Sequence, residues 1–289
     1  MRRLALLALF LVACGATPVE AHTLALAYAK GDQHRYALHM TLNMSVDVGS
    51  VAELVKIDIT GSEAETVNSV DSSGVADITL SMSGVTVKSS VNGVTSSTTQ
   101  ATPDSDMKVA SDGRVLSFNG LSFSGGSPFG AAGGGSPMRA VLSGSPVKPG
   151  DTWSKDYDQA NPLGTGSVHI TAKSKYLRDE KVNGVQTAVV HTTLTTPMDI
   201  SIDFAKVAQM AAAAAPLKGF GIEGMTFKGT TVSDVTTWFD TKARSMVKST
   251  FTSNIDATFS FTLAANSTFP GPAGPFTIKG TEAMEINPA

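Results

Sequence analysis

A cluster of acidic side chains near residue 155 is the first candidate for chemistry in this sequence. The stretch DTWSKDYD holds Asp151, Asp156 and Asp158, and carboxylates so close together could act as an acid/base pair or bind calcium. A solvated strand entry explains the same residues more simply, with Asp151 in a turn and Trp153 packed inward. We favour this second interpretation.

Neither the histidines nor any known catalytic sequence motif indicates an active site. His169 alternates with apolar residues, which places it on a wetted strand face, and His191 lies among threonines. Neither has a carboxylate neighbour at a spacing that suggests a general base. The sequence also lacks a Gly-x-Ser-x-Gly elbow, a His-Glu-x-x-His motif, paired cysteines and a dinucleotide fingerprint. We therefore predict no catalytic residues, no metal site and no cofactor, and we do not expect an enzyme; a secreted enzyme of unrecognised type is the weakest alternative.

Cys14 has a clearer chemical role, and it is the only cysteine in the chain. Leu-Val-Ala-Cys at 11–14 matches a lipoprotein box, in which the cysteine is acylated and holds the protein on a membrane. Val-Glu-Ala at 19–21 instead matches a small-x-small cleavage site, which would release a soluble protein beginning at His22. The apolar run ends directly at Cys14, which favours acylation. Copper chelation by a new N-terminal His22 is a minor alternative, because no partner histidine is specified.

Residues 1–21 have the order of an export signal, and the bulk composition agrees with an exported folded protein. Arg2 and Arg3 precede an apolar run over 4–13 that is too short to span a bilayer as a helix. The chain has 289 residues, of which 42% are hydrophobic and 16% charged, so it can bury a large core. Its net charge is −3 and its lysines and arginines are scattered, so we expect no nucleic-acid partner. Any protein partner is unknown.

The remaining chain alternates apolar and polar residues with a period of two. The pattern is clearest over 36–46 and 247–263, with shorter runs at 56–60, 76–82, 168–172 and 188–194. Side chains of a strand point alternately to opposite faces, so these runs predict strands with one apolar and one wetted face. Such strands are typical of antiparallel sheets. We expect a mainly β protein with a curved antiparallel sheet, of half-barrel or barrel-like form.

Turn and helix signals divide the chain further. Hairpin turns are predicted at Asp71–Gly74, Asn92–Gly93, Asp112–Gly113 and Asn183–Gly184. One short covering helix is predicted over 204–215, with Asp203 as its N-cap and Pro216 as its stop.

The predicted domain organisation has two β halves around a loop-rich centre. A Gly/Ser/Pro-rich linker or loop over 119–149 separates an N-terminal half at 22–118 from a C-terminal half at 150–289. The order of turn and strand signals repeats in the two halves, which leaves an internal duplication open as one alternative.

The lipobox, the early Lys-Gly-Asp-x-x-x-Tyr, the central PVKPGDTW and the later TTWFDTKARSMVKSTF together resemble an uncharacterised family of exported bacterial β-rich proteins. More distantly, the architecture is similar to the half-barrel lipoproteins that include LolA, LppX and LprG. That resemblance implies a curved sheet and covering helices around an apolar cavity for acyl chains. This sequence departs from the pattern in offering a single covering helix.

These observations lead to an expected function at the cell envelope. We expect an exported, lipid-anchored protein on the outer face of the membrane, whose partners are the membrane, through acylated Cys14, and a lipid or other hydrophobic small molecule. The alternatives are a secreted form and a non-enzymatic structural or adhesion module. The predicted apolar ligand face, for which ordinary core packing is the simpler explanation, consists of Tyr36, Leu38, Met40, Leu42, Phe251, Ile255, Phe259 and Phe261.

The anchor can be tested by replacing the cysteine. We expect the wild-type protein in the membrane fraction and the Cys14→Ala protein in the soluble fraction, because only a thiol can be acylated at this position. If both proteins are soluble and begin at His22, the lipobox interpretation is wrong.

Overall fold

The computed structural model describes residues 20–48, 51–99, 101, 104–119, 139–160, 167–203, 220–269 and 271–289. All regular elements within these ranges are strands. No helix in this part of the chain is long and apolar enough to cross a bilayer. The predicted helix at 204–215, residues 1–19 of the predicted export signal and residues 120–138 of the predicted linker lie outside the described ranges. The division into two β halves stays a prediction.

The strands, in chain order, are β1 (His22–Thr23), β2 (Gln33–Val48), β3 (Val51–Val70), β4 (Ala76–Val91), β5 (Val94–Thr99), β6 (Ser105–Val109), β7 (Val115–Asn119), β8 (Pro146–Val147), β9 (Thr152–Ala160), β10 (Ser167–Val182), β11 (Val185–Asp203), β12 (Ile222–Asp240), β13 (Ser245–Leu263) and β14 (Phe276–Pro288).

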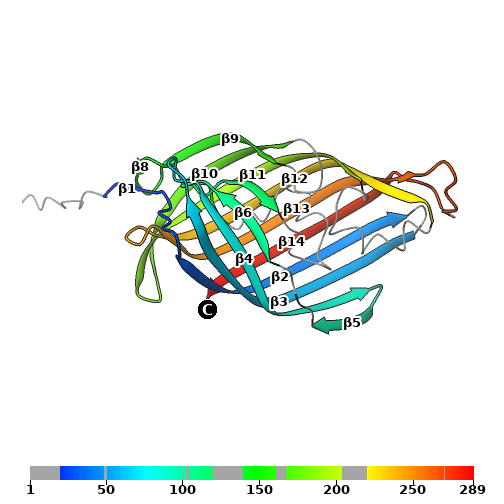
Figure 1. Ribbon diagram of the computed structural model, residues 1–289, viewed down its shortest axis with the longest axis horizontal. Coiled ribbons are helices and arrows are strands. Elements are labelled where there is room, and N and C mark those ends of the chain that lie inside the picture. Colours follow the sequence, from blue (N-terminus) through cyan, green and yellow to red (C-terminus); the bar gives the residue numbers. More distant parts are fainter. Residues whose placement is uncertain are drawn as a thin grey trace, which may run out of the picture.

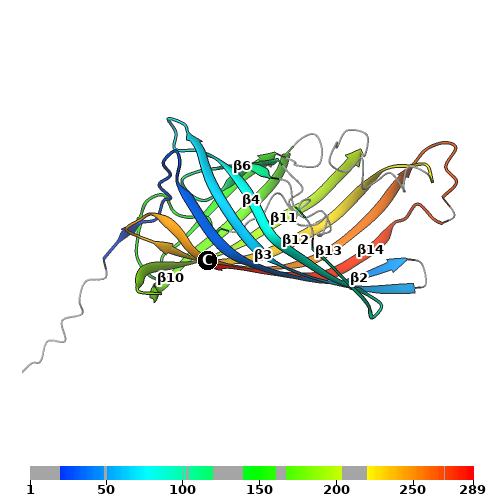
Figure 2. The ribbon, with the colours of Figure 1, turned by 60° about the horizontal axis from the view of Figure 1, so that its bottom comes forward.

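One strongly curved antiparallel sheet forms the body of the molecule. Its strand order is β7-β6-β4-β3-β2-β14-β13-β12-β11-β10-β9, with β5 added beside β4. The pairing of β14 with β2 joins the end of the chain to its beginning. The two edge strands, β7 and β9, lie close together without being hydrogen-bonded neighbours in the sheet. The sheet is therefore a nearly closed barrel, and Figures 1 and 2 show its curvature from two sides.

The alternating pattern sets which residues face the interior. Along β13, Phe251, Ser253, Ile255 and Ala257 are buried while the residues between them are exposed. The same alternation is seen on β12 and β14. The expected mainly β fold with a curved antiparallel sheet is confirmed, because burial of one face imposes period two on each strand.

All four predicted hairpin turns are present. Asn92 and Asn183 have positive φ angles and each is followed by a positive-φ glycine, as tight hairpins need. Asp71 stabilises its turn by accepting a hydrogen bond from the backbone N–H of Ser73. Gly113, with a φ of 84°, also packs against the plug segment described next, since an added Cβ would lie 2.7 Å from the carbonyl oxygen of Ala140.

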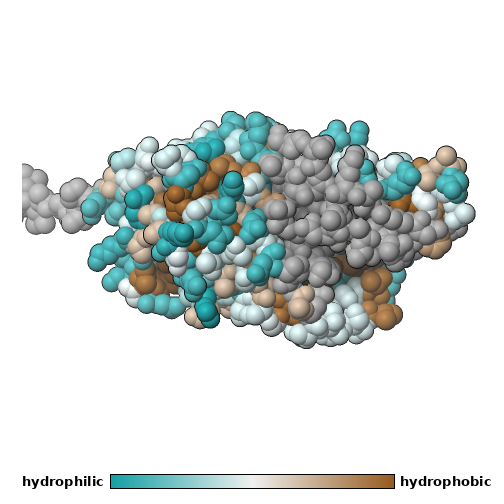
Figure 3. Space-filling view, viewed as in Figure 1, coloured by the Kyte–Doolittle hydropathy of each residue, from teal (hydrophilic) through white to brown (hydrophobic). Residues whose placement is uncertain are grey.

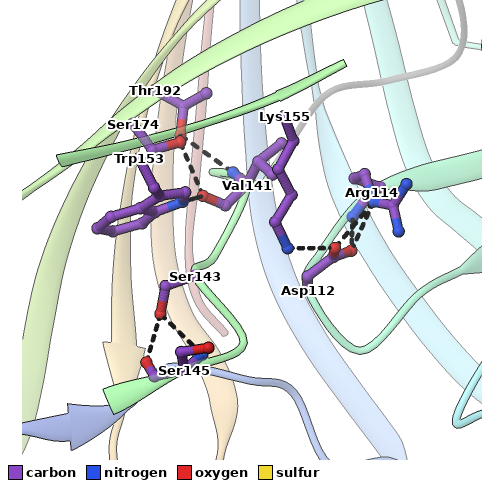
Figure 4. Close-up of polar contacts among 9 residues, drawn as sticks. All are labelled: Asp112, Arg114, Val141, Ser143, Ser145, Trp153, Lys155, Ser174 and Thr192. Atoms are coloured by element: carbon purple, nitrogen blue, oxygen red, sulfur yellow. Dashed lines mark hydrogen bonds and ion pairs between the residues drawn. The ribbon is translucent and has the colours of Figure 1, made fainter. Parts of the chain in front are cut away.

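A short stretch of chain, the plug segment (Arg139, Ala140, Val141 and Leu142), crosses the interior of the barrel. Its backbone is held by side chains of four neighbouring strands. Val141 N–H donates to Thr192 Oγ1, and Val141 O accepts from Ser174 Oγ and Trp153 Nε1 (Figure 4). Ala140 N–H donates to Thr237 Oγ1. Because a buried backbone group needs a hydrogen-bond partner, these hydroxyls make the crossing stable.

Buried apolar side chains form two clusters, which divide the interior along its length. One contains Leu24, Leu26, Ala140 and Leu142 packed against β3, β4, β6, β7 and β11. The other is larger and is made mostly of inward residues of β2, β3 and β10 to β14, with Val141 as its contact to the plug segment. The first cluster thus closes one end of the barrel with chain that is not part of the sheet.

Side chains join the two edges of the sheet where backbone pairing is missing. Asp112, in the turn before β7, accepts a hydrogen bond of 2.6 Å from Lys155 of β9 and one of 2.8 Å from Arg114 Nε (Figure 4). The guanidinium of Arg114 also lies 5.5 Å from the ring centre of Tyr157 on β9. Burial alone would raise the pKa of Asp112, but the hydrogen bonds from Lys155 and Arg114 outweigh it and hold that pKa below its usual value.

Candidate functional site

The residues predicted as an apolar ligand face lie together on the interior side of the sheet. Six of them are buried members of the larger cluster, and Phe259 and Phe261 are half-buried against it. The six are Tyr36, Leu38, Met40, Leu42, Phe251 and Ile255. The two groups, on β2 and β13, are brought together by β14, which pairs with both strands. Their use as a ligand face stays a prediction.

The pairing register arranges inward residues in rows across the strands. One row is apolar and contains Met40, Met284, Phe251 and Val235 from β2, β14, β13 and β12. The next row contains Leu42, Glu282, Ser253 and Ser233 from the same four strands. The interior is therefore mainly apolar, with a polar row beside an apolar one.

Phenylalanine rings gather at the end of the barrel away from the plug segment. The Phe259 ring lies 4.9 Å from that of Phe276 and 5.5 Å from that of Phe261, and Phe261 lies 5.3 Å from Phe269. Phe259, Phe261 and Phe269 are each only half-buried. This aromatic group offers flat apolar surface, which is suited to packing against hydrophobic molecules.

Glu282 is an acid inside this interior. Its side chain is only 5% exposed, and burial raises its pKa to about 7, because a charged carboxylate is poorly solvated there. Its neighbour across the strand pair, Ser253, accepts a hydrogen bond of 2.9 Å from Ser233. Glu282 was not among the predicted site residues, although it occupies an inward position between apolar ones.

A second polar group includes the first residue of the plug segment, Arg139. Arg139 forms an ion pair with Glu65 of β3, and both side chains are almost fully buried. Glu63 lies two positions from Glu65 on the same strand face. Tyr36 donates a hydrogen bond to the carbonyl of Met246 nearby. Among the described residues, Glu63 Oε1, Tyr28 OH and Arg139 Nε have no hydrogen-bond partner.

The acid nearest to this ion pair is held in its neutral form. Burial and, to a lesser extent, the charge of Glu65 raise the pKa of Glu63 from 4.5 to about 8, and the charge of Arg139 opposes the change. Because folding raises this pKa, the folded state binds the proton more tightly than the unfolded state. The contribution of Glu63 to stability is therefore present at low pH and declines as the pH rises toward 8.

The first candidates for acid/base chemistry lie on the outer face of the barrel. Asp151 closes a turn with Lys148 and Trp153 packs inward, as expected. Asp158 pairs with His169 at 2.9 Å, which is a cross-strand contact that sequence spacing does not show. His191 lies 3.3 Å from Asp234. Within the described residues, no group of histidine, cysteine and acidic side chains could hold a metal ion.

A groove of about 650 Å³, lined mainly by polar residues, lies on the outer face beside the hairpin that β4 and β5 form. Its lining residues include Lys56, Lys88, Asp58 and several serines and threonines. Over the described part of the face seen in Figure 3, hydrophilic and hydrophobic side chains are interspersed. Among the described residues, the clustered apolar side chains of the strands lie on the inside of the sheet.

Comparisons with known proteins assign no family. No family model matches the chain and no curated protein matches it. DynF from the dynemicin biosynthesis pathway of Micromonospora chersina is 6% identical, with 95% of this chain and 86% of that chain covered and a TM-score of 0.23. A domain assigned to outer membrane lipoprotein sorting in Vibrio parahaemolyticus is 9% identical, with 89% and 83% covered and a TM-score of 0.14. At these TM-scores neither likeness carries an argument, and the expected family stays a prediction.

The buried ion pair beside the plug segment can be tested at pH 6, where Glu63 is neutral. We expect Arg139→Met to lower the free energy of unfolding by about 3–5 kcal/mol, because it leaves the Glu65 carboxylate buried without its partner. The measurement is urea-induced unfolding followed by circular dichroism.

Two further variants identify the cause of this loss. Arg139→Met combined with Glu65→Leu should recover most of it, since no unpaired charge remains. Arg178→Met, which breaks the exposed pair with Glu180, should change the stability by less than about 1 kcal/mol. A double variant as unstable as Arg139→Met alone would contradict the assigned role.

Proposed function

We propose that this chain is an exported envelope protein that binds a lipid or another hydrophobic molecule inside its barrel. The observation that carries the proposal is the width of the sheet. Among the described residues, eleven strands follow one another around the barrel. About eight strands enclose an interior that side chains can fill or that holds one small ligand. A wider barrel needs additional contents.

The two ends of the barrel meet this need differently. At one end, Leu24, Leu26 and the plug segment supply apolar side chains from outside the sheet. At the other end, the rings of Phe259, Phe261 and Phe269 remain half-exposed. Burial of apolar surface contributes about 25 cal/mol for each Å², so a hydrophobic ligand that covers these rings would be bound favourably. This supports the aromatic end as the ligand site.

The lipid anchor is part of the same proposal. Acylation of Cys14 would attach the chain to the membrane shortly before β1, which begins at His22. The turn before β13 contacts this N-terminal region, since Arg244 Nε donates to the carbonyl of Ala25. The aromatic rings lie at the opposite end of β13. An anchored barrel would therefore present its closed end to the membrane and its aromatic end away from it.

A structural or adhesion role is the second candidate, and the polar groove on the outer face favours it. Lysine ammonium groups and hydroxyls would suit a polar partner. Such a role would use the outside of the sheet and would be insensitive to changes inside the barrel.

The ligand proposal can be tested with a neutral fluorescent probe, N-phenyl-1-naphthylamine, and the purified processed protein. We expect the wild-type protein to bind the probe and Phe261→Asp to weaken binding at least tenfold, because the new carboxylate would have to be desolvated by an apolar ligand. The measurement is the rise of probe fluorescence with protein concentration.

The matched control is Thr262→Asp, which adds the same charge on the opposite face of β13, where the side chain is exposed. This variant should bind the probe as the wild-type protein does. Circular dichroism establishes that both variants are folded. Failure of the wild-type protein to bind the probe, or equal losses in the two variants, would overturn the proposed function.

A further inference from the structure

Glu282 differs from the other buried acids in having no cation beside it. Asp112 pairs with Lys155 and Arg114, and Glu65 pairs with Arg139. Glu63 is also within the influence of the Arg139 charge. Among the described residues, no hydrogen bond or ion pair reaches the Glu282 carboxyl group, and burial is the single cause of its raised pKa.

The side chains around Glu282 would suit the polar group of a bound hydrophobic molecule. Its neighbours along the inward face of β14 are Gly280 and Met284, and across the sheet they are Leu42 and Ser253. None of these side chains is charged. The Ser233 hydroxyl donates to Ser253 Oγ, so two hydroxyl oxygens lie in the same row as the carboxyl group. The row therefore offers hydrogen-bond acceptors within an apolar interior.

Burying an acidic side chain without a partner costs free energy. Whether the carboxyl group is ionised or neutral decides which ligand group would stabilise it. An ionised carboxylate without a partner is strongly disfavoured in apolar surroundings. An ammonium group relieves that cost best, because it brings the opposite charge and three N–H donors, and charge-assisted hydrogen bonds are roughly twice as strong as neutral ones. A carboxylate or sulfate group would instead be repelled.

We infer that Glu282, with the hydroxyls of Ser253 and Ser233, binds the amine of an elongated hydrophobic ligand. This inference rests on the proposed function and narrows its ligand class to cationic amphiphiles. The hydrocarbon part lies against the apolar rows of β2, β13 and β14, and the amine lies at the polar row. The preference for an amine thus comes from the Glu282 carboxyl group and its two serine neighbours in a mainly apolar lining.

The test compares decylamine, decanol and decanoate as competitors of N-phenyl-1-naphthylamine at pH 7.5, on the processed wild-type protein. The three compounds share one chain length and differ in the polar group. We expect decylamine to bind at least tenfold more tightly than decanol, and decanoate to bind most weakly. In Glu282→Gln this preference for the amine should disappear, while the affinity for the probe itself is kept.

The control variant is Glu285→Gln, which makes the same change on the outer face of β14, where Glu285 pairs with Lys248; it should keep the preference for the amine. A second readout needs no substitution at Glu282. Infrared spectroscopy of the wild-type protein at pH 6, below the raised pKa of Glu282, should show the band of a protonated carboxyl group decrease when decylamine is added, and no such change with decanol.

The outcomes separate the two proposals. If no competitor and no probe binds, the proposed function itself fails. If the probe binds but the amine has no advantage in the wild-type protein, or keeps its advantage in folded Glu282→Gln, the inference about Glu282 is overturned while the hydrophobic site stands. If Glu282→Gln does not fold, an unchanged infrared carboxyl band on addition of decylamine overturns the inference.

Discussion

The interior of a wide barrel has to be filled, and this requirement explains most other features of the molecule. Among the described residues, eleven strands in succession form a barrel wider than the eight-stranded barrels whose interior side chains alone can fill. At one end the chain meets the requirement itself: the plug segment crosses the interior, and Leu24 and Leu26 pack beside it. At the other end the half-exposed aromatic rings leave apolar surface available. The difference between the two ends is what makes a ligand-binding role physically reasonable.

A backbone segment that crosses an apolar interior needs hydrogen-bond partners there. The plug segment carries N–H and C=O groups that must be paired, and the inward hydroxyls of Thr192, Ser174 and Thr237 pair with them. The Arg139–Glu65 pair meets the same need for charges. Against this background, a buried acid whose only perturbation is desolvation, such as Glu282, is the exception.

The strands, the turns and the apolar parity could be predicted from the sequence, because each depends on local chemistry. Burial of one face gives period two, and Asn-Gly pairs favour the positive φ angles of tight hairpins. The pairing of β2 with β14 could not be predicted, since it joins the two ends of the chain. The inward position of Glu282 could have been predicted, because this acid alternates in step with the apolar residues Ile278, Met284 and Ile286. The role of Arg139 could not have been predicted, because its partner Glu65 is far away in the sequence.

The central claim is that the barrel carries a hydrophobic molecule. Native mass spectrometry of the processed protein, purified from membranes without strong detergent, tests it most directly. The account predicts a population heavier than the bare polypeptide by the mass of a hydrophobic compound, which is released when the protein is denatured. Spectra that contain only the polypeptide with its covalent modifications, together with a structure in which the chain itself fills the aromatic end of the interior, would contradict the account.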